Sequence, residues 1–149
     1  MPNYDLSGLP DPVIDRQFYA GVPFKRLIAW FIDFSAILAV VVGASIVTFG
    51  IAAVLFPVTL FIVNLCYRIY FLKTKSATPG MMIVGIEIRN HLGNRLTPTE
   101  SIWHTIVFTA SIMFVFVQIL SMGMMLFSQR NQGVHDYFCG TTAINKPIP

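Results

Sequence analysis

A long apolar run with a single charge limits this chain more than any other feature of its sequence. Over residues 27–67, Asp33 is the only residue with a formal charge. As one helix this run would be about 60 Å long, twice the hydrocarbon thickness of a bilayer. We therefore expect two membrane spans, at about 25–47 and 51–72, joined near Gly50.

The composition supports a membrane environment. Hydrophobic residues make up 55% of the 149 residues and charged residues 11%, whereas a soluble domain carries about 25% charged residues. The lipid bilayer is therefore the expected main partner. The formal net charge of +3 is too small and too scattered for a nucleic-acid interface, so no nucleic-acid partner is expected.

A capping box predicts the start of a third helix. Thr97 and Glu100 flank Pro98 at the spacing that lets the two side chains cap a first helical turn. The segment stays apolar through Phe127, so a third span is expected at about 98–127. The predicted fold class is an all-α membrane protein, a small bundle of about three transmembrane helices.

The connection between the second and third spans is more than a plain loop. Pro79-Gly80 is a turn signal, and residues 82–89 alternate between apolar and small or charged side chains toward their end. We expect a short cytoplasmic hairpin or interfacial segment here. A short interfacial helix over residues 79–85 is the alternative.

Basic residues set the expected orientation. They gather before the first span and in the connection over 73–97, whereas the turn between the first two spans has none. The positive-inside rule then places the N-terminus in the cytoplasm. Residues 1–23 are expected to form a flexible N-terminal tail, 24–145 a single transmembrane domain and 146–149 a C-terminal tail, whose side of the membrane the charges leave open.

Four polar residues lie near the cytoplasmic ends of the first two spans. Arg26 and Asp33 are seven residues apart, two helical turns, and so share one face. Asn64 and Arg68 lie at similar depths in the second span, so Asp33 is expected to meet one of these three groups. Three interpretations stay open: an ion pair that holds helices together, a direct part in ion or proton movement, and contact with a partner protein.

Glu100 and His104 form a second candidate pair, because residues i and i+4 share a helix face. Either they titrate together near neutral pH, or Glu100 caps the helix and His104 lies at the interface. His135-Asp136 lacks a third ligand at helical spacing, and no Ser–His–Asp arrangement, phosphate loop or metal-ligand spacing appears. We expect no catalytic site, no cofactor and no metal.

Three segments, near the two ends and in the middle of the chain, carry further patterns. They are Lys25 to Asp33, then Thr78-Pro79-Gly80 with Gly85, and finally Gly133-Val134-His135-Asp136 followed by Gly140-Thr141. Together they resemble the RDD family of membrane proteins over about residues 20–145. The middle segment departs from the family pattern, because Ser76, Ala77 and Met81 stand where Gly, Gln and Lys are usual.

This resemblance implies a small multi-pass protein of the bacterial cell (inner) membrane, an RDD-like domain in which Arg26, Asp33 and Asp136 are key positions. Cation/proton antiport has been proposed for some members, so transport of a cation or proton is the expected function. Three spans rarely enclose a pathway, so a homo-oligomer or a partner membrane protein is expected. The alternative is a non-catalytic accessory or scaffold subunit of a membrane complex.

The third span and the family resemblance conflict in one respect. A straight third span places Asp136 on the far side of the membrane from Arg26. The two side chains meet only if the segment over 98–128 turns back, for which Ser121–Gly123 is the expected place. Three spans remain the prediction from the sequence.

Overall fold

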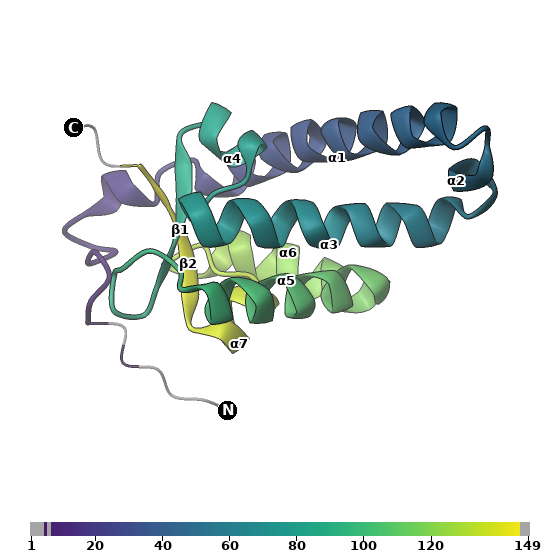
Figure 1. Cartoon of the computed structure of the whole chain (residues 1–149). Helices are drawn as coiled ribbons and strands as arrows, with labels where there is room; N and C mark the ends of the chain where they lie inside the picture. The colour runs from purple at the N-terminus through teal and green to yellow at the C-terminus, as the bar shows by residue number, and fades with distance from the viewer. Residues whose placement is uncertain (1–4, 6, 147–149) are drawn as a thin grey trace.

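The structure, a computed structural model, describes residue 5 and residues 7–146 and consists mostly of helices with one small sheet (Figure 1). Two helices are long and apolar enough to cross a membrane, and the count rises to three if a bent helix pair is taken as one span. The chain is therefore a helical protein of membrane type.

The two long helices are α1 (Val22–Val47) and α3 (Phe56–Lys75), which lie side by side with the short helix α2 (Ile51–Val54) at their far end (Figure 1). Gly50 has a φ of 91°, in the left-handed region that suits glycine, and this residue reverses the chain. The expected junction of the first two spans lies at this residue.

The third apolar segment is bent. It forms α5 (Pro98–Met113) and α6 (Val115–Phe127), whose axes differ in direction by 116°. The extended backbone of Phe114 separates the two helices. A straight span over 98–127 is therefore wrong, and the chain turns seven residues before the expected place near Ser121. No proline or glycine lies at the bend, so the apolar pattern runs through it without a break.

The start of α5 matches the capping box. The Glu100 amide donates to Thr97 Oγ1 over 3.3 Å, and the Thr97 amide donates to Glu100 Oε2 over 2.7 Å. Two otherwise unpaired amides of the first turn are thus satisfied. Local sequence chemistry fixed this end of the helix, although it did not reveal the bend.

The connection after α3 contains a short helix and a strand. Helix α4 (Pro79–Ile83) precedes strand β1 (Ile86–Asn90), and β1 pairs in antiparallel fashion with β2 (Thr141–Asn145), with Ile88 opposite Ala143. The expected local hairpin is reduced to one isolated bridge between Arg89 and Arg95. The fold is therefore not purely α-helical, because residues near the C-terminus complete a small sheet.

The packed core lies at one end of the helix bundle. Figure 1 shows α4, β1, β2 and the short helix α7 (Val134–Cys139) gathered where α1 begins and α3 ends. Apolar side chains away from this end are largely exposed, as expected where lipid surrounds the helices. The core residues are Val22, Ala29, Leu72, Ala77, Met81, Ile86, Ile88, Leu96 and Ala143.

The segment before α1 also packs against this end. Leu9 and Tyr19 are buried, a 3-10 turn spans Arg16–Phe18, and Asn131 Nδ2 donates to the Tyr19 carbonyl over 2.7 Å. The flexible tail expected over 1–23 is therefore held in place where it is described. The prediction for residues 1–4 and 6, like that for residues 147–149, lies outside the described residues.

Candidate functional site

An ion pair joins the start of α1 to α7. Arg26 Nη1 lies 2.5 Å from Asp136 Oδ2, and the Asp136 side chain is fully buried. The Gly133 amide donates to the same carboxylate oxygen over 3.1 Å, so Asp136 also caps α7. Charge-assisted hydrogen bonds of this kind are the stronger ones in proteins. Residues 110 positions apart are thus held together.

Two buried histidines complete this group, which we call the Asp136 cluster: Arg26, His104, His135 and Asp136. His104 Nε2 lies 3.1 Å from Asp136 Oδ1, and His135 Nε2 lies 3.0 Å from Arg26 Nη2. An arginine only donates and a carboxylate only accepts, so His104 carries its proton on Nε2 and His135 on Nδ1. The Nδ1 atoms of both rings are buried without a hydrogen-bond partner among the described residues.

The charge states of the α7 residues follow from these contacts. Burial alone would raise the pKa of Asp136, but the charge of Arg26 and the bond from His104 hold it well below its usual value. Burial lowers the pKa of His135 to about 3; Asp136 opposes this and Arg26 adds to it. Asp136 is therefore ionised and His135 neutral at neutral pH.

Asp33 forms a second buried polar centre. Its carboxylate accepts hydrogen bonds from Tyr67 Oη over 2.8 Å, from Thr78 Oγ1 over 2.5 Å and from the Gly80 amide over 2.8 Å. These donors come from α3, from the residue before α4 and from α4 itself. The Asp33 carboxylate therefore holds α1 against both α3 and α4.

The partners expected for Asp33 are different in the structure. Within the described part of the chain, Asp33 forms no ion pair with Arg26 or Arg68 and no hydrogen bond with Asn64. Arg26 is instead used by Asp136, and Asn64 is only partly buried. The hydroxyl and amide donors replace the ionic partner because together they satisfy a buried carboxylate.

The Glu100–His104 pair is not brought together. Glu100 accepts from the Thr97 amide and, over 3.1 Å, from Asn90 Nδ2, and so acts as a cap. His104 is buried and faces Asp136 instead of lying at the interface. The two residues are one turn apart on α5, yet their side chains belong to different hydrogen-bond networks.

Sequence reasoning missed Tyr67, Thr78 and His135 as members of these centres. Thr78 could have been found from Thr78-Pro79-Gly80, because a Thr before a Pro is an N-cap pattern, and its hydroxyl does accept from the Met81 amide. No local pattern pointed to Tyr67 as a donor.

Arg68 differs from the other buried charges. Its side chain is 4% exposed, and its guanidinium carbon lies 3.7 Å from the centre of the Phe108 ring, a cation–π contact. It has no ion pair or hydrogen bond with any described residue, and its Nε is buried without a partner. Arg68 is therefore close enough to both carboxylates to feel their charge, without directly contacting either of them.

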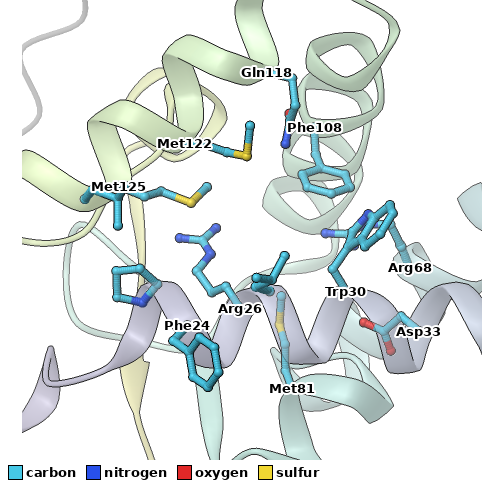
Figure 2. A pocket seen from close by; sticks show the side chains of 13 residues that line it. Phe24, Arg26, Trp30, Asp33, Arg68, Met81, Phe108, Gln118, Met122 and Met125 are labelled. Atoms are coloured by element: carbon cyan, nitrogen blue, oxygen red, sulfur yellow. The ribbon is translucent and has the colours of Figure 1, made fainter. Parts of the chain in front are cut away.

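A cavity of about 490 Å³ opens beside these groups. Figure 2 shows Arg26 reaching into it from α1 and Gln118 reaching in from α6. Its volume is within the range of about 300–1,000 Å³ that is usual for ligand pockets. The lining residues are Pro23, Phe24, Arg26, Leu27, Trp30, Asp33, Arg68, Met81, Phe108, Gln118, Met122, Met125 and Leu126.

Three residues of the Asp136 cluster are of types that can bind metals. Ligand atoms of His104, His135 and Asp136 lie within 4.8 Å of one another. Arg26, however, donates to His135 Nε2 and to Asp136 Oδ2, so its positive charge lies among the same donor atoms. A cation would have to displace this guanidinium, so the arrangement fits an ion-pair network better than a metal centre.

The comparisons with known proteins identify one family. The model of the family described as RDD matches residues 20–140, most of the chain, and the match includes all four residues of the Asp136 cluster and Asp33. No curated protein and no solved structure matches significantly.

Proposed function

The chain belongs to the RDD family, and we propose that it is a transport-related, multi-pass membrane protein whose buried polar network responds to an ion or a proton. The proposed location is the bacterial inner membrane with the N-terminus in the cytoplasm. Basic residues gather around the start of α1 and from the last turn of α3 to the start of α5, and they support this orientation.

One observation carries the proposal: four charged side chains are buried in or beside apolar helices. They are Arg26, Asp33, Arg68 and Asp136. Asp33 lies about 16 Å along α1 from its first residue, as counted from the helical rise. Ionisable groups at such depths are costly and often mark ion or proton pathways.

His104 offers a way for a proton to affect the network. It donates through Nε2 to Asp136, while its Nδ1 is free of any hydrogen bond with the described residues. A proton on Nδ1 creates a second cation beside Asp136, which already pairs with Arg26. The two cations then compete for one carboxylate, so protonation weakens the contact between α1 and α7.

The proposal predicts cation-dependent proton movement in vesicles that contain the purified protein. We expect the replacements Asp33→Asn and His104→Gln each to lower the rate of proton movement at least about tenfold. A side chain that transfers protons usually contributes more than this factor to a rate. A pH-sensitive dye trapped inside the vesicles measures the rate, with sodium or potassium added outside.

Glu100→Gln is the matched control, because Glu100 lies one turn from His104 and Gln can still complete the capping box. This variant should keep the wild-type rate. Folded wild-type protein that moves no protons at any pH or with either cation would refute the proposal.

A smaller role is the alternative. The described part of the chain has two helices, or three with the bent pair, that are long and apolar enough to span a membrane. So few spans rarely enclose a pathway, so the proposed transport uses a homo-oligomer or a partner membrane protein. The chain would instead be an accessory or scaffold subunit if it co-purifies in a fixed ratio with another membrane protein and moves no ions alone.

A further inference from the structure

Arg68 is a buried positive charge without a contacting anion. Arginine stays protonated in proteins, so the side chain carries its charge even though it is 4% exposed. It makes no hydrogen bond or ion pair with the described residues, and its contact with the Phe108 ring is a cation–π contact only. An unpaired buried charge is strongly unfavourable. A bound anion would therefore stabilise the buried charge of Arg68.

The two buried carboxylates nearby already have other bonding partners. Asp136 pairs with Arg26 and accepts from His104, and Asp33 accepts three hydrogen bonds from hydroxyl and amide groups. Both act on Arg68 only through longer-range attraction. The anion that contacts Arg68 must come from outside the described chain.

The cavity provides the space for it. Arg68, Arg26 and Gln118 line the same cavity of about 490 Å³ (Figure 2). The amide of Gln118 can donate to an anion that Arg68 binds. A guanidinium offers two parallel N–H groups, which match the paired oxygens of a phosphate.

The rim of the cavity shows how the anion arrives. The side chains Phe24, Leu27, Trp30, Met122 and Leu126 are apolar, and each is exposed or partly exposed. In a membrane these side chains face acyl chains. A small aqueous anion would meet an apolar opening, whereas a lipid can place its chain along the rim and its headgroup inside.

The depth of Arg68 fits a headgroup. Lys75, the last residue of α3, follows seven residues later, so Arg68 lies about 10 Å from the end of the span. We propose that the cavity binds an anionic phospholipid of the surrounding bilayer, with the lipid phosphate on Arg68 and an acyl chain against the apolar rim. This site is independent of the proposed transport, since a protein without ion flux would still bind the lipid.

Native mass spectrometry of the full-length protein in detergent tests the site. The protein is offered equal amounts of phosphatidylglycerol and phosphatidylcholine, and the lipid that stays bound is counted. We expect the wild type to retain phosphatidylglycerol in preference. Arg68→Gln should lower this preference at least about tenfold, because a charge-assisted contact is lost.

Lys73→Gln is the matched control, since it removes the same charge from an exposed residue of α3 outside the cavity. It should keep the preference. If Arg68→Gln does not fold, Leu27→Trp, which fills the cavity and leaves both arginines in place, should reduce retention instead.

Three outcomes would overturn the proposal. The first is equal retention of the two lipids by the wild type. The second is a preference unchanged by Arg68→Gln together with retention unchanged by Leu27→Trp. The third is protection of the wild type against heat by inorganic phosphate as strongly as by phosphatidylglycerol, which would assign the cavity to small anions and not to lipid.

Discussion

At the residue scale, Asp136 joins several elements of the fold through one carboxylate. It pairs with Arg26, faces His104 and caps its own short helix through the Gly133 amide. Arg26 in turn donates to His135. Each group has a charge or tautomer that its neighbours require, so the cluster is sensitive to any added proton.

His135 predicts a stability that depends on pH. Its pKa is about 3 in the fold, against an ordinary value of 6.5, so the unfolded chain binds a proton that the folded chain excludes. The free energy of unfolding should therefore fall as the pH drops below 6.5, on the order of 1 kcal/mol per pH unit. Thermal unfolding in detergent between pH 8 and pH 4 measures this fall.

The variant His135→Gln should show a shallower fall. Asp136, whose pKa is lowered, adds a further loss of stability only below its ordinary value of 3.8. A wild type with the same unfolding temperature at pH 7 and pH 5 would contradict the assignment of a neutral, buried His135.

At the element scale, the contact between α1 and α4 depends on glycine at position 80, which has no side chain. A Cβ atom on Gly80 would lie 2.3 Å from the Ala29 carbonyl oxygen and 2.8 Å from Asp33 Oδ1. Only glycine lets the α4 backbone come close enough to donate to Asp33. The Asp33 centre is therefore built on close backbone packing as much as on charge.

Gly80→Ala should destabilise the protein by about 1–3 kcal/mol, because α4 must move away and Asp33 loses a donor. The control is Gly43→Ala on α1, where a Cβ meets no atom within 4 Å and a helix interior gains from alanine. Unfolding temperatures in detergent compare the two. Equal temperatures for Gly80→Ala and the wild type would argue against this close contact.

Some boundaries of the helices and strands could be predicted from the sequence, and others could not. The junction at Gly50 and the start of α5 were predictable because each depends on local chemistry, a left-handed glycine and a capping box. The bend at Phe114 was not, because the residues on both sides are equally apolar. Strand β2 was missed because its partner β1 lies more than 50 residues earlier, and such pairings leave no local pattern.

The candidate site, too, could be predicted only in part from the sequence. The family resemblance singled out Arg26, Asp33 and Asp136, and all three are buried polar centres in the structure. Their partners were not predictable, because a carboxylate can be satisfied by Tyr67 and Thr78 as well as by an arginine.

At the scale of the whole molecule, the Arg26–Asp136 pair bears on topology. Asp136 follows the bent pair α5–α6 and still contacts the beginning of α1, so the segment enters and returns toward the same end of the bundle. Together with the basic residues near α1, this supports a C-terminus on the same side as the N-terminus.

Reporter fusions test this arrangement. A phosphatase reporter active only outside the cytoplasm should be inactive when fused after Pro149 and active when fused near Phe49, the exposed turn between α1 and α2. A fluorescent protein that matures only in the cytoplasm should give the opposite pattern. An active phosphatase after Pro149 would show that α5 and α6 cross the membrane as one span.

The long sequence separation between Arg26 and Asp136 also matters during synthesis. Arg26 is made 110 residues before its partner, so α1 and α3 can enter the membrane while the arginine still lacks its carboxylate. Assembly of the buried network must then wait until Asp136 has been made. A chain that stops before Asp136 leaves Arg26 without the carboxylate that neutralises it.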